Sequence, residues 1–193
     1  MARPEAEKAK NMHNRKSPRA FWHDYNGGLY FVTIVTQNRK PYFGSITDGV
    51  MHLSPIGQIL EKHITALPDH FPYANNVQFV IMPNHVHLLV YVDKNKAATY
   101  HRSHKTVVSL SQHQKRSHYF SDVAQLQGLL SVIIGGIKSA TTREARKLGL
   151  TFGWQSRFHD HIVKGHDDWM LINDYIYHNV ERWSNDMFNP SKK

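Results

Sequence analysis

The chain contains no cysteine among its 193 residues. This absence excludes a disulfide-stabilised scaffold, a cysteine nucleophile and thiolate-bound metal or iron–sulfur centres. Long apolar runs are also lacking, because the longest, residues 129–137, is far shorter than the roughly 20 residues of a membrane-spanning helix. No apolar segment follows Met1, so no signal peptide is expected. We therefore expect a cytoplasmic protein.

Acidic residues are scarce, with 15 Asp and Glu against 24 Lys and Arg, so the formal net charge is +9. A field of this sign favours polyanionic partners, nucleic acid before an anionic membrane. The alternative is a basic protein without a polyanionic partner. Hydrophobic residues make up 40% of the chain, which is enough for one folded domain.

Composition divides the chain into a central domain and two tails. Residues 1–20 are basic and carry few large apolar side chains, so we expect a flexible N-terminal tail there. The domain is predicted over residues 21–185. A second tail is expected at residues 186–193.

Residues 94–120 are expected to form a basic loop within this domain. Six Lys and Arg residues, four histidines and no acidic residue lie between positions 94 and 118. This composition is typical either of a loop that contacts nucleic acid or of a solvated insertion. Lys115 and Arg116 are the candidate contacts in this segment.

The apolar periodicity predicts alternating strands and helices. In chain order we expect a strand at 29–36, a hairpin with arms 42–46 and 50–53, a helix at 55–67, strands at 77–82 and 85–92, a helix at 123–148, a strand at 159–163 and a last helix from 167 or 168 to 183. This order predicts an α+β fold, with an antiparallel sheet and helices packed on one face. The open face of such a sheet is a common platform for single-stranded nucleic acid.

His85 and His87 lie two residues apart in one predicted strand. Alternate strand residues point to the same face, so both imidazoles project together, away from Val86 and Leu88 on the core side. Two neighbouring imidazoles form half of a divalent-metal site. The alternative is a pair of exposed or hydrogen-bonded histidines, because 15 histidines make such pairs common by chance.

The last helix offers a second candidate, Tyr175 together with Asn179. At about 100° per residue, positions four apart lie on the same side of a helix. Tyr177 lies about 160° from Asn179 on the same wheel, on the opposite flank. If a tyrosine acts beside an asparagine ligand, the geometry selects Tyr175. The alternative is an ordinary tyrosine at the edge of the buried stripe.

The segment 154–161 combines aromatic side chains with Arg157 and His161. Aromatic rings stack on bases, while Arg and His contact phosphates. The alternative is a packed loop anchored by Trp154 and Phe158.

Five short motifs follow one another along the chain: 30–39 (YFVTIVTQNR), 82–89 (MPNHVHLL), 137–139 (IKS), Trp154-Gln155 with Phe158 and Asp160-His161, and Asp174-Tyr175-Ile176 with Asn179. In this order they resemble the motifs of the single-tyrosine HUH transposases, and especially those of the REP-associated tyrosine transposases of bacteria. The resemblance covers most of the chain from Phe21 to Trp183. Two positions depart from the usual pattern: Val180 stands where relatives carry proline, and His159 where an aromatic residue is common.

The resemblance implies a ferredoxin-like or RRM-like sheet. It implies that His85 and His87 bind a divalent metal, Mg²⁺ or Mn²⁺, with Asn179 as a third, amide ligand. Tyr175 is the implied nucleophile. The implied substrate is single-stranded DNA near a hairpin, handled by a monomer or a homodimer in the bacterial cytoplasm.

The DNA contacts that we expect come from the motifs, the basic end of the helix at 123–148 and the basic loop. They are Arg39, Lys138, Arg143, Trp154, Gln155, Arg157 and His161, together with Lys115 and Arg116.

The expected chemistry is phosphodiester transfer. A tyrosine that attacks phosphorus keeps the 5′-phosphate and releases a 3′-hydroxyl, and the covalent link lets another 3′-hydroxyl rejoin the strand without ATP. Two other functions remain open at this point. One is a domesticated, non-catalytic module that binds single-stranded nucleic acid, and the other is a metal-dependent phosphodiesterase in which water attacks.

Overall fold

A computed structural model of the chain describes residues 23–107 and 128–190. The predicted tail 1–20, Lys115 and Arg116 lie outside the described residues. The elements are β1 (Gly28–Val35), η1 (Gln37–Arg39), β2 (Gly44–Thr47), β3 (Val50–Leu53), α2 (Pro55–Thr65), α3 (Leu67–His70), β4 (Ala74–Met82), β5 (His85–Val92), α4 (Lys94–Val107), α6 (Leu129–Lys147), β6 (His159–Ile162), α7 (Gly165–Tyr177) and η2 (Trp183–Asn185).

The main sheet has four strands in the order β4-β5-β1-β6, and each neighbouring pair is antiparallel. Helix α2 connects β1 to β4, and α6 connects β5 to β6, so two β-α-β units interleave as in a ferredoxin-like sheet. The predicted α+β fold with an antiparallel sheet is confirmed. Strands β2 and β3 form a separate hairpin, whose Asp48 and Gly49 both have positive φ, as a type I′ turn requires.

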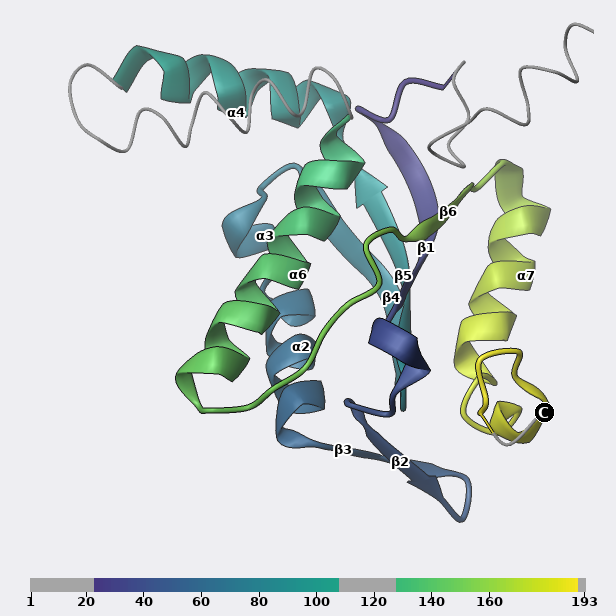
Figure 1. The fold of residues 1–193 in the computed structure, drawn as a ribbon. Coiled ribbons are helices and arrows are strands. Elements are labelled where there is room, and N and C mark those ends of the chain that lie inside the picture. Colours follow the sequence, from purple (N-terminus) through teal and green to yellow (C-terminus); the bar gives the residue numbers. More distant parts are fainter. Residues whose placement is uncertain (1–22, 108–127, 191–193) are drawn as a thin grey trace, which may run out of the picture.

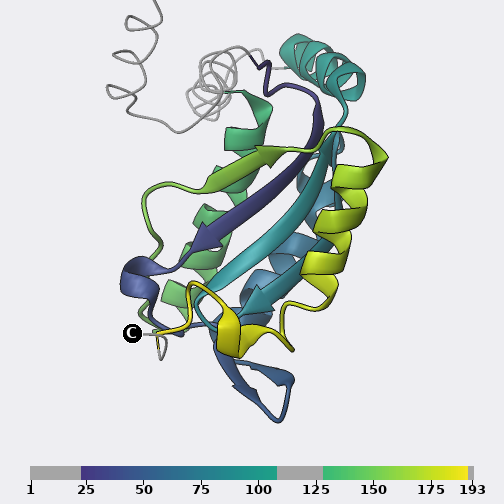
Figure 2. The same ribbon diagram turned by 90° about the vertical axis from the view of Figure 1, so that its right-hand side faces the viewer.

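Helices cover both faces of the main sheet. Helices α2 and α6 lie on one face, and α7 lies on the other (Figure 1; Figure 2 shows the sheet from the side of α7). The alternation of β5 sends Leu88 into the large core under α2 and α6, while Leu89 packs against Ile172 and Ile176 of α7. The prediction of helices on one face only is therefore wrong, and so is that of an open sheet face. Strand β5 is buried on both faces from His85 to Val90, as expected for a central strand of a sheet that is covered on both sides.

Helix α7 ends at Tyr177, not at Trp183 as predicted. His178 departs from helical geometry, with φ −92° and ψ 9°, and turns follow it. The amide of Asn179 donates to the carbonyl of Ile176, a three-residue step that tightens the chain beyond the helix. Asn179 therefore lies in a turn after α7.

Two predicted irregular segments are ordered. The expected tail at 186–193 is wrong for residues 186–190, because Asp186 and Phe188 are buried and the amide of Phe188 donates to Asp186 Oδ1 (2.6 Å). The expected basic loop begins as helix α4, since Asp93 Oδ1 caps its start by accepting from the amides of Asn95 and Lys96 (2.9 and 3.0 Å). None of the helices in residues 23–107 and 128–190 is long and apolar enough to cross a membrane.

Gly57 is required by a close approach between α2 and the chain that enters β2. A Cβ at this position would collide with the carbonyl oxygen of Phe43. We expect Gly57→Ala to lower the free energy of unfolding by about 1–3 kcal/mol. A Cβ at Gly135 in α6 meets nothing within 4 Å. We expect the control Gly135→Ala to raise stability by about 0.5–1 kcal/mol. Urea unfolding of both variants tests the contrast, which equal midpoints would contradict.

Candidate metal centre and nucleophile

His85 and His87 project from β5 toward α7, and their Nε2 atoms lie 3.0 Å apart. Their exposed fractions are 0% and 2%. Burial penalises the charged form and lowers the pKa of both imidazoles well below the usual range. Both histidines are therefore neutral near pH 7, the form in which imidazole binds metals.

The side chain of Asn84 fixes the tautomer of His85. Its Nδ2 donates to the carbonyls of Arg39 (3.0 Å) and Phe188 (2.8 Å), so its Oδ1 faces His85 Nδ1 at 2.9 Å. An amide oxygen only accepts, so Nδ1 of His85 carries the proton and Nε2 presents a lone pair. That lone pair points at His87.

His87 is held from β1, the neighbouring strand. Thr33 lies opposite it in the strand register, with Oγ1 2.8 Å from His87 Nδ1, and Phe31 stacks on the ring at 5.2 Å. When Thr33 accepts from Nδ1–H, the Nε2 atom of His87 also presents a lone pair. Two lone pairs that face each other across 3.0 Å repel unless a cation lies beside both. The pair therefore fits a divalent ion.

Two buried oxygen donors lie in the same region, Asp186 beside the histidines and Asn179 beside Tyr175. Asp186 is buried, and its Oδ2 lies 3.8 Å from His85 Nε2; one ligand atom from each of Asp186, His85 and His87 falls within 4.8 Å of the others. Asn179 is 2% exposed, and its Oδ1 has no hydrogen-bond partner among the described residues. A buried acceptor without a donor is costly, and a cation would satisfy it. The buried His-His-Asp cluster could hold a metal, with two imidazole nitrogens and a carboxylate oxygen as donors.

Tyr175 places its hydroxyl 3.3 Å from His87 Nε2. The ring packs edge-on against Phe31 (5.9 Å) and against His87 (5.2 Å), which fixes its orientation. Burial raises the pKa of Tyr175; the Asn179 amide opposes this rise and the Asp186 carboxylate adds to it. Tyr177, in contrast, is 72% exposed. The structure thus brings Tyr175, His85 and His87 together.

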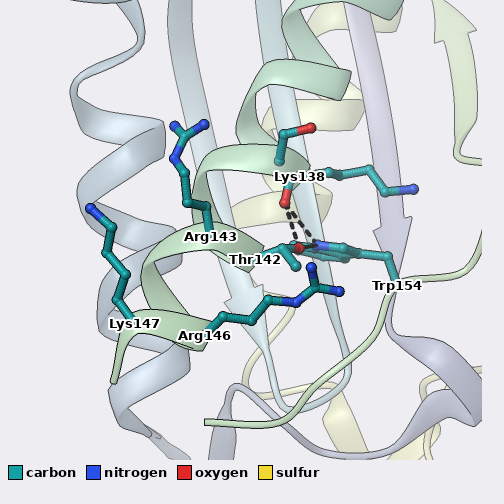
Figure 3. A pocket seen from close by; sticks show the side chains of 7 residues that line it. Lys138, Thr142, Arg143, Arg146, Lys147 and Trp154 are labelled. Atoms are coloured by element: carbon teal, nitrogen blue, oxygen red, sulfur yellow. Dashed lines mark hydrogen bonds between the residues drawn. The ribbon is translucent and has the colours of Figure 1, made fainter. Parts of the chain in front are cut away.

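The predicted DNA contacts fall mainly in two grooves, one along α6 and one at the η1 turn. The α6 groove has a volume of about 600 Å³ and is lined by Lys138, Ser139, Thr142, Arg143, Arg146, Lys147 and Trp154 (Figure 3). The turn groove, of about 660 Å³, is lined by Gln37, Asn38, Arg39, Trp154, Gln155 and Ser156. Trp154 belongs to both.

Two of the predicted contacts hold the protein itself together. Trp154 Nε1 donates to the carbonyl of Lys138 and to Thr142 Oγ1, both at 3.2 Å (Figure 3). Lys138 Nζ donates to the carbonyl of Gln155 at 2.6 Å. These contacts agree with the alternative of a packed loop anchored by Trp154.

Arg157 and His161 lie outside both grooves. Arg157 is exposed in the loop before β6. His161 Nε2 lies 2.9 Å from Asp168 Oδ2, near the start of α7.

Sequence reasoning missed Asp186, Asn84 and Thr33. Asp186 was assigned to a tail, and no local pattern connects it to histidines a hundred positions earlier. The available signal for Asn84 was its place directly before His85, in the tight connection between two strands. Thr33 could have been found only from the register of β1 against β5.

The sequence of the chain is similar to those of two known proteins. No protein-family model matches the chain. An uncharacterized protein of Haemophilus influenzae is 29% identical over 177 residues, covering 91% of this chain and 93% of that protein. A second H. influenzae protein, named as a candidate REP-associated tyrosine transposase, is 26% identical over 154 residues, covering 79% of this chain and 70% of its own length.

A solved structure of a REP-associated tyrosine transposase bound to a REP hairpin shares the fold. Its TM-score is 0.55 at 19% identity, and the match covers 87% of this chain and 74% of that one. This likeness shows the fold. Paired histidines on a central strand, facing a tyrosine on a covering helix, are the arrangement that the resemblance to the single-tyrosine HUH class implies. The resemblance to the REP-associated tyrosine transposases is confirmed by the second H. influenzae relative.

The Asn84 and Thr33 hydrogen bonds predict an effect on metal affinity. We expect Asn84→Ala and Thr33→Val each to weaken Mn²⁺ binding by about 10–100-fold. Each substitution removes the hydrogen bond that orients one imidazole, that of His85 and that of His87 respectively. Calorimetric titration of the full chain measures this, with circular dichroism to verify folding. Asn75→Ala removes an exposed asparagine on β4 and should leave the affinity unchanged. Equal affinities in all the variants would show that these partners do not orient the site.

Proposed function

We propose that the protein is a metal-dependent single-stranded DNA endonuclease and strand transferase, a tyrosine transposase that acts near DNA hairpins through a 5′-phosphotyrosine intermediate. The observation that carries this proposal is the position of the Tyr175 hydroxyl, 3.3 Å from His87 Nε2 at the edge of a buried cluster of metal-type donors. Resemblance to the REP-associated tyrosine transposases supports the same chemistry.

His85, His87, Asn179 and Asp186 are the residues that would hold the divalent ion. When bound, Mg²⁺ or Mn²⁺ supplies charge stabilisation at the scissile phosphate and favours the ionised form of the nearby phenol. The donor set fits this role because it combines two neutral imidazoles with an acceptor that lacks a partner in the described structure.

Tyr175 supplies the nucleophile. Because burial raises its pKa, the phenol is protonated at neutral pH and must lose its proton as it attacks. The Tyr175 oxygen forms a bond to phosphorus, the bond from phosphorus to the 3′ oxygen breaks, and that oxygen leaves as a hydroxyl after taking up a proton. The strand on the 3′ side of the break stays on the protein through its 5′-phosphate until another 3′-hydroxyl attacks and regenerates the phenol.

Packing positions the hydroxyl before substrate arrives. The Phe31 and His87 rings flank the tyrosine, so little rotational freedom remains to be lost on reaching the transition state. Phe188 lies 4.7 Å from the ring of His85 on the other side and shields the histidines from water.

One chain supplies every proposed catalytic group. Tyr175, His85, His87, Asn179 and Asp186 come together within a single copy, so we propose that the tyrosine acts beside the histidines of its own chain. A monomer would be sufficient for cleavage, and a homodimer would carry two complete sites. The proposed substrate is hairpin DNA, in keeping with the net charge of +9 and with the REP hairpin bound in the structural relative.

Covalent trapping tests the proposal. The full chain is incubated with Mn²⁺ and 3′-labelled single-stranded oligonucleotides that carry the hairpins flanking its gene, and the products are separated on a denaturing gel. We expect a labelled protein band that disappears with a chelator and in Tyr175→Phe. The matched control Tyr177→Phe should retain it, since that side chain is exposed.

Two other results would contradict the tyrosine mechanism. Salt-sensitive binding without a covalent band, whatever the hairpin, would indicate a non-catalytic binding module. Cleavage that survives Tyr175→Phe but is lost in His85→Ala would indicate attack by water.

A further inference from the structure

The α6 groove and the turn groove share Trp154, and Arg39 of the turn groove lies beside Phe188, whose ring contacts His85. We propose that the two grooves form one DNA track that leads around the end of the sheet: the α6 groove holds the phosphates of a hairpin stem, and the turn groove guides the adjoining single strand to Tyr175. This inference rests on the proposed function, because it assigns the path of that substrate.

The α6 groove carries positive charge that the described residues leave unpaired. Arg143, Arg146 and Lys147 are exposed and form no ion pair in the described part of the chain. The neighbouring Glu144 turns away and contacts Lys62 and His63 of α2 at 2.8 and 2.9 Å. The groove side of α6 rises about 13 Å from Lys138 to Lys147, the length of about four base pairs. Such a row of cations matches the backbone of a duplex and reads no sequence.

The turn groove has a different character. Its lining is mainly neutral and hydrogen-bonding, with the amides of Gln37, Asn38 and Gln155, and Arg39 is its one cation among the described lining residues. Amide side chains can pair with the edges of unstacked bases, which a duplex hides and a single strand displays.

The turn groove is also preformed. Asn38 and Arg39 have positive φ (56° and 54°), a geometry that the surroundings must hold in place. The amide of Gln37 donates to the carbonyl of Gly153 at 2.7 Å, and Asn84 Nδ2 donates to the carbonyl of Arg39 at 3.0 Å. A fixed turn of this kind costs little ordering free energy when a flexible strand binds.

Arg39 links the track to the catalytic cluster. Its Nη1 donates to the carbonyl of Met187 at 3.2 Å, and its guanidinium lies 5.2 Å from the centre of the Phe188 ring, which contacts His85. Helix α6 and helix α7 lie on opposite faces of the sheet, so DNA held on α6 must pass the end of the sheet to reach Tyr175. The η1 turn lies at that end, beside the C-terminal segment (Figure 2).

Binding of two stem-loop probes separates the two parts of the track. Both carry a hairpin from the flanks of the gene; one ends blunt at the foot of the stem, and the other has a single-stranded extension of about eight nucleotides, tested on the 5′ and on the 3′ side. Fluorescence anisotropy with the full chain and a chelator measures affinity without cleavage. The variants are Arg143→Ala/Arg146→Ala in the α6 groove and Arg39→Ala in the turn groove. Lys40→Ala is the matched control, because it removes a neighbouring exposed cation outside both grooves.

We expect the double variant to weaken binding of both probes by about 10-fold or more and to reduce the salt slope by about 2. Arg39→Ala should weaken binding about 10-fold only for the extended probe, on one of its two sides, as expected for one charge-assisted contact. Lys40→Ala should change neither affinity by more than about 2-fold.

Three results would contradict the proposed track. Arg39→Ala could weaken binding of the blunt and the extended probe equally, the extension could add no affinity for the unaltered chain, or Lys40→Ala could weaken binding as much as Arg39→Ala does. The covalent assay distinguishes this failure from failure of the proposed function. Adduct formation together with unchanged Arg39→Ala binding rejects the track alone. The predicted binding pattern without any adduct retains the track and rejects the tyrosine chemistry, while absence of hairpin binding rejects both.

Discussion

The buried side chain of Asn84 joins three parts of the molecule. Its oxygen sets the tautomer of His85, and its two N–H groups donate to the η1 turn at Arg39 and to the C-terminal segment at Phe188. The connection between β4 and β5 is tight, so Asn84 has little freedom to move away from the histidine that follows it. One amide therefore holds the candidate metal centre, one wall of the turn groove and the C-terminal segment that covers the histidines. Loss of any of its hydrogen bonds would leave a buried polar group without a partner, a cost of about 1–3 kcal/mol.

Covering the second face of the sheet is what creates the candidate site. Ile172 and Ile176 bury against Leu89, and each such side chain contributes about 1.5–3 kcal/mol of hydrophobic stabilisation. The same packing brings Tyr175 to His87, and the Asn179 amide lies against Tyr175. The proposed nucleophile is thus positioned by core packing, while the basic surface lies behind the sheet on α6. The proposed catalytic residues and the basic residues of α6 thus lie on opposite faces of the sheet. DNA that contacts both must pass from one face to the other, and we propose that it does so along the turn groove.

Local patterns predicted the parts of this structure that depend on local physics. Alternation along β5 was sufficient to place His85 and His87 on one face, and the hairpin of β2 and β3 was predicted from its two strand-like arms. Helical spacing separated Tyr175 from Tyr177. The run of apolar residues from Leu88 to Val90 also contained a signal that both faces of β5 are covered, although a sheet covered on one face was predicted.

The remaining features depend on contacts between distant segments. Asp186 reaches His85 only after the chain has closed over the site, so no spacing rule identifies it. The end of α7 at Tyr177 carries no proline or glycine signal, and Asn179 is placed by the turn that follows. Asp93, directly before Lys94, is a residue that favours the start of a helix. The basic composition of the segment that follows led instead to the prediction of a loop.

The measurement that tests the central claim most directly is mass spectrometry of the chain after incubation with Mn²⁺ and hairpin DNA, followed by nuclease and protease digestion. Our account predicts a nucleotide linked through its 5′-phosphate to the peptide that contains Tyr175, and to that tyrosine. A nucleotide on Tyr177 or on any other side chain, or cleaved DNA with an unmodified Tyr175 peptide, would contradict it.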